Sequence, residues 1–162
     1  MSNHDNPIFP VLGRIPSGVF ILTAANGEGQ ETGMLASWVQ QASFEPQQVS
    51  VAVNGSRYLN QWLKDGSVVG LNLLSEAGGK FLSHFGKGFE PDEDAFTDLE
   101  TETVSGVRVL NEAMGYLIGK VVSRMVTGDH VIYLIEITEA GQADNFEDEE
   151  PMVHIRKSGG HY

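Results

Sequence analysis

Short apolar runs separated by turn residues recur along most of this chain and restrict the folds that it can adopt. They cover residues 18–24, 34–43, 49–53, 68–74, 116–126, 131–138 and 152–157. Asn26-Gly27 follows the first run, and Thr127-Gly128-Asp129 joins the two longest runs, as expected of hairpin turns. Runs of this length that are bounded by Gly, Asn and Asp predict strands rather than helices.

Helical patterns are few in this sequence. One segment begins after Ser56, which can cap a helix, and stops at Asp65-Gly66; another begins after Ser75 and ends at Gly86. The acidic stretch 90–102 predicts irregular structure. Because helices do not alternate with the strands, the sequence predicts a mainly β protein, a closed or nearly closed antiparallel barrel with a few short flanking helices.

The length and the lack of cysteine set the domain count and exclude several chemistries. A chain of 162 residues predicts a single domain over residues 1–162. Without cysteine there is no disulfide, thiolate metal site or iron–sulfur ligation, and a reducing cytoplasm is the expected compartment. No apolar run reaches the roughly 18 residues that cross a bilayer, and Met1–Pro7 lacks the pattern of a signal peptide. We therefore expect no membrane partner.

The charge argues against nucleic acid as a partner. Only 10 Lys and Arg residues face 22 Asp and Glu residues, for a net charge of −12. A duplex binder needs a basic surface that displaces counterions, and this chain has too few cations to form one. The acids concentrate in residues 90–102 and 144–150, which predicts solvated loops without the spacing of a calcium site.

Standard catalytic motifs are absent from the sequence. It has no nucleophile elbow, phosphate loop or His-Glu-x-x-His motif, and its five histidines lie far apart at positions 4, 84, 130, 154 and 161. We therefore predict no metal site. A hydrolase is disfavoured, whereas a flavoenzyme remains compatible, because the cofactor supplies the reactivity and the protein supplies position and water exclusion.

The segment 33–46, followed by the strand 49–53, is the strongest candidate for a ligand site. It combines small hydroxyl residues, amides and Trp38 in an extended run that closes at Pro46. This combination suits a flat, hydrogen-bonding cofactor along a sheet edge, although an ordinary strand–turn–strand with a polar solvent face has the same pattern. An anionic ligand would need one of the scarce cations, which are Arg14, Arg57, Lys80, Lys87, Arg124, Arg156 and Lys157.

Five segments resemble the flavin reductase-like family of FMN-binding split barrels, and they span most of the chain. They are residues 12–23, 33–46, 54–58, 128–137 and 154–162. Within that family the resemblance is strongest to the flavin reductase-like domain at the C-terminal end of cyanobacterial diflavin flavoproteins. It rests on Leu-Ala-Ser-Trp-Val-Gln-Gln-Ala-Ser-Phe at 35–44, Leu-Glu-Thr-Glu at 99–102 and the Arg156–Tyr162 ending. The diiron and flavodoxin domains of those larger proteins have no counterpart in this sequence.

The resemblance implies a six-stranded antiparallel split barrel that binds FMN, with FAD or riboflavin as alternatives, at the interface of a homodimer. It implies a set of site residues as well. Ala36, Ser37, Trp38 and Val39 would line the isoalloxazine, Ser43 would reach the ribityl or phosphate end, and Asn54, Ser56 and Arg57 would surround the phosphate. His130 would face the nicotinamide of NAD(P)H and is the candidate catalytic residue.

Each of these residues also has a structural interpretation. Trp38 can serve as core or interface packing, Ser37 and Ser43 as ordinary strand serines, and Arg57 as a solvent-facing side chain. His130 can simply bond Asp129 or a carbonyl group. Position 38 also departs from the family, which more often has a small residue there, and an indole would restrict the approach of nicotinamide.

The resemblance leads to two hypotheses for function. The first is an NAD(P)H-dependent flavin reductase that transfers hydride from nicotinamide to flavin and passes electrons to oxygen or a protein acceptor. The second is a non-catalytic FMN-binding electron carrier that a protein partner reduces. A weaker third option is a split barrel that binds haem or a pyridoxal-type phosphate.

Overall fold

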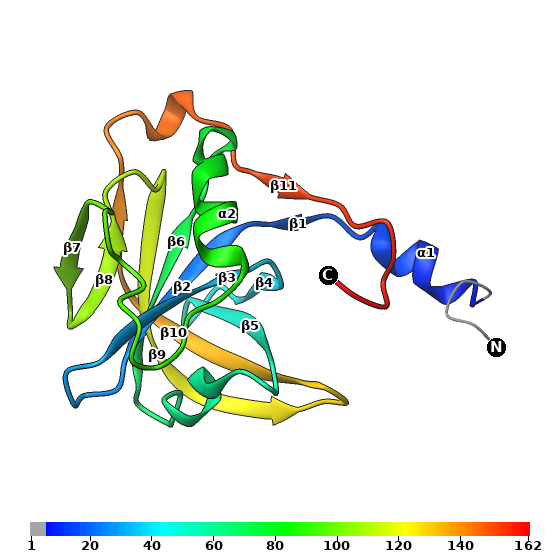
Figure 1. Cartoon of the computed structure of the whole chain (residues 1–162), viewed down its shortest axis with the longest axis horizontal. Helices are drawn as coiled ribbons and strands as arrows, with labels where there is room; N and C mark the ends of the chain where they lie inside the picture. Colours follow the sequence, from blue (N-terminus) through cyan, green and yellow to red (C-terminus); the bar gives the residue numbers. More distant parts are fainter. Residues whose placement is uncertain (1–5) are drawn as a thin grey trace.

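The computed structural model describes residues 6–162, and one antiparallel sheet forms its body (Figure 1). The strands of this sheet are β2 (Phe20–Ala25), β3 (Glu31–Ala36), β4 (Val39–Ser43), β5 (Gln48–Asn54), β6 (Val68–Leu73), β9 (Gly115–Val126) and β10 (His130–Gln142). They pair in the order β3-β2-β6-β9-β10-β5-β4. The expected mainly β fold is confirmed. Residues 1–5, with His4 and most of the segment examined for a targeting signal, lie outside the described residues.

Alternation along the strands places the core inside the curved sheet. In β5, Val49, Val51 and Val53 are buried, while the residues between them face the other side. Across the sheet, Tyr133 of β10 is fully buried, and its hydroxyl donates a hydrogen bond to Asn60 Oδ1 at 2.8 Å. The buried phenol is therefore satisfied, as buried polar groups must be.

The long hairpin of β9 and β10 bends around this core. Its register shifts between Leu134 and Ile135 and again between Ile137 and Glu139, as expected of bulges that curve a strand. The predicted turn is present, because the Thr127 amide donates to the His130 carbonyl at 2.9 Å. The hairpin thereby places His130 at the first position of β10, opposite Asn54 of β5.

The expected strand 34–43 is instead two strands separated at Ser37-Trp38. β3 pairs with β2, whereas β4 pairs with β5 on the other side of the barrel. At the break, the Trp38 carbonyl accepts a hydrogen bond from the Ala52 amide at 3.0 Å. For this reason the main sheet within residues 6–162 has seven strands rather than the six expected. The crossover exposes the backbone and side chains of these two residues to a cavity.

The second predicted helix is present, whereas the first is wrong. Helix α2 (Gly79–Gly86), preceded by the 3-10 turn η3 (Glu76–Gly78), buries Phe81 and Phe85 and ends at Gly86 as expected. After Ser56 only a single 3-10 turn forms, η2 (Tyr58–Gln61). The Ser56 hydroxyl does not cap it, because that hydroxyl donates to Asn54 Oδ1 at 2.7 Å. Local side-chain bonds of this kind compete with helix formation.

Helix α2 packs closely on the barrel at Gly33 of β3. A Cβ atom at this glycine would lie 2.8 Å from the Phe85 ring, which is 1% exposed. The rings of Phe81, Phe89 and Phe96 surround Phe85 and form with it a second apolar cluster, separate from the core inside the barrel. This packing therefore fixes the position of α2 beside β3.

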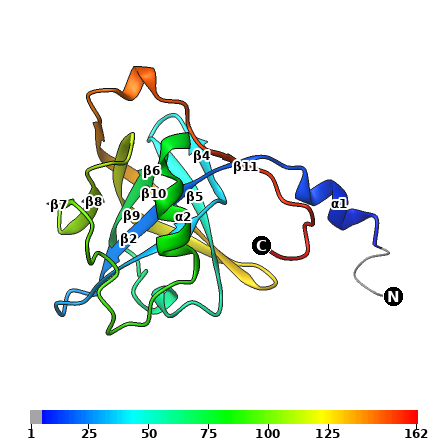
Figure 2. The same cartoon turned by 45° about the horizontal axis from the view of Figure 1, so that its top comes forward.

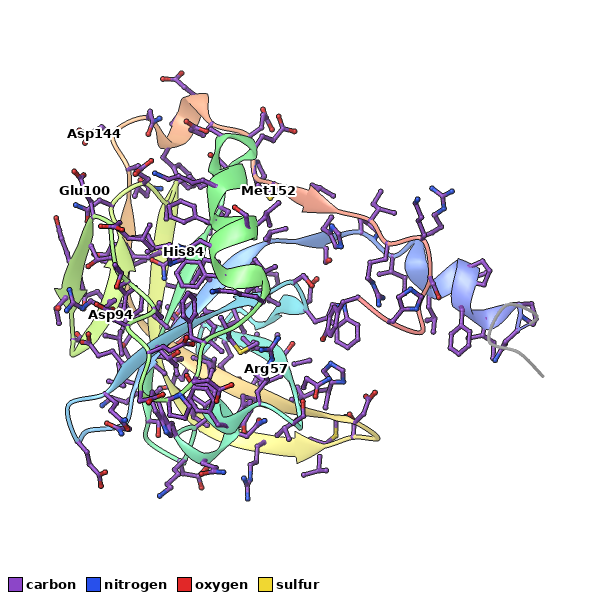
Figure 3. The ribbon with its side chains drawn as sticks, viewed as in Figure 1. Arg57, His84, Asp94, Glu100, Asp144 and Met152 are labelled. Atoms are coloured by element: carbon purple, nitrogen blue, oxygen red, sulfur yellow. The ribbon has the colours of Figure 1, made fainter. Side chains whose placement is uncertain are left out.

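The acidic stretch is irregular only in part. It ends in a hairpin that the sequence analysis did not predict, formed by β7 (Thr101–Val104) and β8 (Val107–Leu110), whose turn holds Ser105 at a positive φ of 50°. Figure 3 shows Asp94, Glu100 and Asp144 on the side of the barrel away from the two chain ends. Among residues 6–162 no group of acidic and histidine side chains could hold a metal ion, and no helix there is long and apolar enough to cross a membrane.

The two ends of the described chain form an arm that projects from the barrel (Figures 1 and 2). The arm contains α1 (Ile8–Gly13), β1 (Ser17–Gly18) and β11 (Val153–His154), and β1 pairs with β11. The expected strand 152–157 is thus shorter than predicted. Beyond β11, the Arg156 amide donates to the Gly13 carbonyl at 2.9 Å and the Gly159 amide donates to the Phe9 carbonyl at 2.7 Å. These bonds turn the tail back toward the barrel.

Candidate functional site

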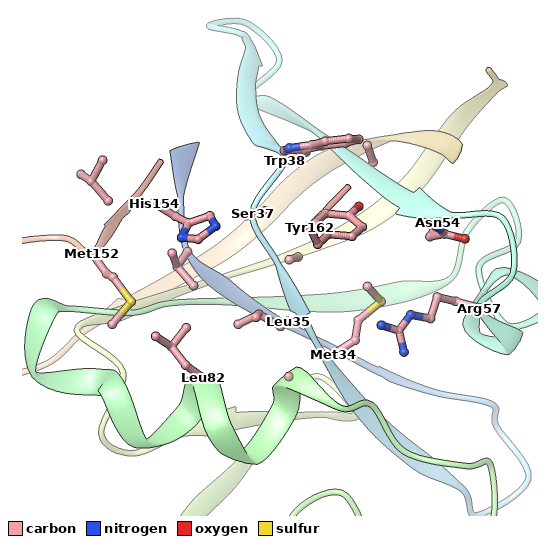
Figure 4. Close-up of a pocket in the computed structure, with 15 residues that line it drawn as sticks. Met34, Leu35, Ser37, Trp38, Asn54, Arg57, Leu82, Met152, His154 and Tyr162 are labelled. Atoms are coloured by element: carbon pink, nitrogen blue, oxygen red, sulfur yellow. The ribbon is translucent and has the colours of Figure 1, made fainter. Parts of the chain in front are cut away.

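A cavity of about 580 Å³ opens where the β3–β4 break, the end of β5, helix α2 and the tail meet (Figure 4). We call it the main cavity. Its lining consists of Val19, Met34, Leu35, Ala36, Ser37, Trp38, Ala52, Asn54, Arg57, Leu82, Gly86, Met152, Val153, His154 and Tyr162. Its volume falls within the range of about 300 to 1,000 Å³ that is typical of small-molecule sites.

Most of this lining is apolar, and its polar groups gather at particular points. Met34, Leu35 and Leu82 form one side, and Figure 4 shows Arg57 at one end and His154 with Met152 at the other. Such a distribution suits an elongated ligand with a flat apolar body and an anionic group at one end.

The Arg57 end is built from a tightly bonded turn after β5. Asn54 Oδ1 accepts hydrogen bonds from the Ser56 amide at 2.9 Å and the Ser56 hydroxyl at 2.7 Å. The Arg57 amide donates to the Asn54 carbonyl at 3.0 Å, and Asn60 Nδ2 donates to the same carbonyl at 2.8 Å. The turn therefore holds the Arg57 backbone in a fixed position.

The Arg57 guanidinium is free to bind an anion. Within residues 6–162 the ion pairs join Lys80 with Glu112, Arg108 with Glu31, and His130 with Asp129, and none includes Arg57. Its Nη1 atom fills the space where a side chain at Gly88 would lie, and Gly88 has a φ of +78°. A second cavity of about 420 Å³, which we call the Arg57 cavity, continues past this guanidinium and is also lined by Lys87, Phe89, Glu90 and Glu93.

One wall of the main cavity is aromatic: Trp38 and Tyr162 line it, and His130 lies behind them. The Trp38 ring centroid lies 4.6 Å from that of His130 and 5.5 Å from that of Tyr162. The Arg156 guanidinium lies over the indole at 5.0 Å from its centroid, a cation–π distance. Trp38 is therefore the centre of this wall.

Hydrogen bonds link Asp129, His130 and Tyr162 in a chain. His130 Nδ1 lies 2.6 Å from Asp129 Oδ1, and His130 Nε2 lies 2.6 Å from the Tyr162 hydroxyl. Because a carboxylate only accepts hydrogen bonds, Nδ1 of the neutral ring carries the proton and Nε2 accepts from Tyr162. The bond to His130 lowers the pKa of the Asp129 carboxyl, and burial of the Tyr162 hydroxyl raises the pKa of that phenol.

The structure brings some of the predicted residues into one cavity and separates others. Ala36, Ser37, Trp38, Asn54 and Arg57 all line the main cavity. Ser56 lines only the Arg57 cavity, and Val39 lines a third cavity of about 500 Å³ on the other side of Trp38. His130 lies behind Trp38 and Tyr162. Ser43, at the far end of β4, lines none of these three cavities.

Several lining residues were missed by the sequence analysis. Met34 and Leu35 lie inside the singled-out segment 33–46, but their apolar side chains suggested only core packing. Leu82 was missed for a similar reason. Its spacing in α2 suits a buried position, although the residue is 39% exposed. Tyr162 had one available signal, which is its place in the Arg156–Tyr162 ending already noted as a resemblance.

Comparison with known proteins assigns the chain to a family. A model described as "Flavin reductase like domain" matches residues 12–160. The chain belongs to this family. Diflavin flavoprotein A 1 of Synechocystis is 38% identical to this flavin reductase-like domain over 162 residues, covering 98% of the chain and 27% of that protein. A putative diflavin flavoprotein A 3 of the same genus is 39% identical over 153 residues, covering 93% and 25%.

The flavin reductase-like chain thus spans about a quarter of the length of these curated relatives. Among solved structures, an NADH:FAD oxidoreductase of Streptomyces globisporus superimposes with a TM-score of 0.81 at 24% identity, covering 94% of this chain and 87% of that one. The styrene monooxygenase flavin reductase of Pseudomonas putida gives 0.74 at 20% identity, covering 90% of each chain. These likenesses confirm the split-barrel fold, and the family supports a flavin-binding oxidoreductase.

Proposed function

We propose that this chain binds FMN in the main cavity and acts as an NAD(P)H-dependent flavin reductase. The observation that carries the proposal is the Arg57 guanidinium, which forms no ion pair within residues 6–162 and sits at the end of a largely apolar cavity. A guanidinium in this setting suits the phosphate of a flavin mononucleotide, because it can donate to two phosphate oxygens at once.

The cavity residues fit the other parts of the same ligand. Ala36, Ser37 and Trp38 present backbone groups and a hydroxyl at the strand break, where the polar edge of an isoalloxazine needs partners. Met34 and Leu35 offer apolar surface to its rings. Ser56 and Asn54 flank Arg57 at the phosphate end. Ser43 and Val39 have no direct place in this arrangement.

When bound, a flavin supplies the hydride-accepting chemistry, so the protein needs no nucleophile of its own. The apolar lining excludes water from the cavity. His130, held in one orientation by Asp129, would accept a hydrogen bond through Nε2 from the carboxamide N–H of a nicotinamide. Its assigned part is therefore to position the hydride donor.

A non-catalytic FMN electron carrier is the second candidate, and one observation favours it. Nε2 of His130 is already bonded to Tyr162, and Trp38 and Tyr162 together cover the side of the cavity beside it. In this arrangement a nicotinamide has no direct contact with His130, whereas a protein partner can deliver electrons without entering the cavity.

We also propose a homodimer in the cytoplasm, with oxygen or a protein as the electron acceptor. The arm leaves Val11, Ile15 and Val153 largely exposed, and Val153 also lines the main cavity. Apolar side chains gathered on a projecting element are typical of subunit interfaces. Light scattering coupled to size-exclusion chromatography should give twice the chain mass; a monomer would contradict this part of the proposal.

A flavin titration followed by anaerobic mixing tests the proposed function. We expect the purified protein to bind FMN with a visible flavin spectrum, and NADH or NADPH to bleach it. Bleaching only by a reduced protein donor would favour the carrier. No binding of FMN, FAD or riboflavin at saturating concentration would refute both candidates.

A further inference from the structure

The tail places Tyr162 in the opening of the proposed site. Tyr162 lines both the main cavity and the Arg57 cavity, and Figure 4 shows its ring between Trp38 and Arg57. It belongs to none of the residues that the resemblance assigned to flavin or nicotinamide. A side chain at this junction is placed to contact a ligand that occupies either cavity.

Tyr162 also occupies the last free position of His130. An imidazole has two ring nitrogens, and Asp129 already takes Nδ1. The Tyr162 hydroxyl bonds Nε2 at 2.6 Å, and the His130 side chain is only 7% exposed. Because an accepting Nε2 has one lone pair, a ligand that bonds this atom must first displace Tyr162.

The contacts that hold Tyr162 in place are few. Besides His130, its ring contacts Trp38, and the neighbouring His161 carbonyl accepts a long hydrogen bond of 3.3 Å from Arg156 Nη1. The residue as a whole remains 67% exposed. The tail is anchored upstream, at the bond between the Gly159 amide and the Phe9 carbonyl. Gly160, which is less crowded than Gly159 and has the wide backbone freedom of glycine, provides a hinge between that anchor and Tyr162.

We propose that Tyr162 is a specificity-determining residue that sets which electron donors the site accepts. Docked on His130, it keeps a nicotinamide away from Nε2, and a nicotinamide binds only when the tail turns outward at Gly160. A donor that passes electrons from outside the cavity does not need this movement. The proposal rests on the proposed function, in which His130 positions the nicotinamide.

The test is the affinity of FMN-loaded protein for tetrahydro-NADH, a nicotinamide dinucleotide that cannot donate hydride. Isothermal titration compares the native protein with Tyr162→Ala and Tyr162→Phe. A site that is blocked most of the time weakens apparent binding by the open fraction, so we expect Tyr162→Ala to bind about fivefold tighter or more. Tyr162→Phe keeps the ring and loses the bond to His130, so its dissociation constant should fall between the two.

His161→Ala is the matched control, because it alters the same tail at an exposed residue outside all three cavities. It should leave the dissociation constant for the analogue unchanged, and its FMN affinity should match that of the native protein within about twofold. Equal or weaker analogue binding by Tyr162→Ala would overturn the inference, as would tighter FMN binding alone. No analogue binding by any variant would overturn it as well. If the native protein binds no flavin, the proposed function itself fails, and that outcome is visible before any analogue is added.

Discussion

The main cavity has two sides of different construction. The barrel side, formed by β3, the end of β5 and α2, rests on a buried core and on a turn with several internal hydrogen bonds. The tail side, formed by β11 and Tyr162, rests on a two-residue strand pair, two backbone bonds to α1 and the aromatic contacts of Trp38. Under the proposed function, we expect the barrel side to determine ligand affinity and the tail side to determine access.

Local stability differs in the same way along many proteins, since elements with few buried contacts open far more easily than the core. A movable cover beside a rigid binding wall permits the ligand to exchange without unfolding of the site. Substitutions on each side can separate these two roles.

Phe85→Ala should strongly destabilise the barrel side. The ring is 1% exposed and fills the contact between α2 and Gly33, so its removal leaves a cavity in the core. We expect the free energy of unfolding to fall by about 3–5 kcal/mol in urea titrations. Leu82→Ala, on the same helix but 39% exposed, is the control and should cost about 1 kcal/mol or less. Equal losses would mean that α2 is not part of the rigid wall.

Arg57→Ala should separate the phosphate contact from the rest of the barrel side. Loss of a charge-assisted pair should weaken FMN binding by about 10- to 100-fold. Riboflavin, which has no phosphate, should bind as before in a fluorescence titration.

Two variants control this experiment. Arg57→Lys keeps the charge without the planar fork and should recover only part of the affinity. Arg14→Ala removes an exposed arginine at the end of α1 and should change nothing. A matching loss of affinity for FMN and riboflavin in Arg57→Ala would place the guanidinium away from the phosphate.

Gly159→Ala should disturb the tail side and leave the barrel intact. Its Cβ would collide with that of Leu12 and lie 3.1 Å from the Phe9 carbonyl oxygen, so the tail must shift away from α1. We expect the unfolding free energy to change by about 1 kcal/mol or less, while the fluorescence of Trp38 changes as Tyr162 and Arg156 move. Gly79→Ala, where a Cβ meets open space, should leave the emission unchanged. A large stability loss in Gly159→Ala would contradict the division of the two sides.

The smallest effect is expected at alkaline pH. Burial raises the pKa of Tyr133 and of Tyr162 above the ordinary 10.0 of a phenol. The folded state therefore holds these protons more tightly than the unfolded chain, and this stabilisation is complete below pH 10.0 and lost as pH rises through the folded pKa values. Absorbance titration of tyrosinate should show one late-ionising phenol fewer in Tyr162→Phe than in the native protein. An equal number in both would place the tail outside the site.

The barrel side was largely predictable from the sequence, because residues close together in the sequence determine its strands and turns. The short run 49–53, ended by turn residues, predicted a strand, and the scarcity of cations drew attention to Arg57. The helix after Ser56 failed for a local reason too, since the Asn54 side chain captured the groups that would have capped it. The strand break at Ser37-Trp38 follows from the pairing of β3 with β2 and of β4 with β5. The pattern of residues within 34–43 does not indicate this long-range pairing.

The tail side could not be predicted in this way. His130 and Tyr162 are 32 positions apart, and neither lies in a pattern that requires the other. Their contact depends on the path of β11 along β1 and on the turn of the tail at α1, which are properties of the assembled fold. The interpretation of His130 as a residue bonded to Asp129 describes its contact correctly, and its part in positioning nicotinamide stays a prediction.

The hydrogen bond from the Gly159 amide to the Phe9 carbonyl couples the first helix to the tail. Any attachment ahead of α1, whether a natural neighbouring domain or an affinity tag, would pull on the segment that borders the main cavity. Labels and fusions are therefore better inserted at Ser105-Gly106, an exposed hairpin tip on the opposite flank, away from the main cavity.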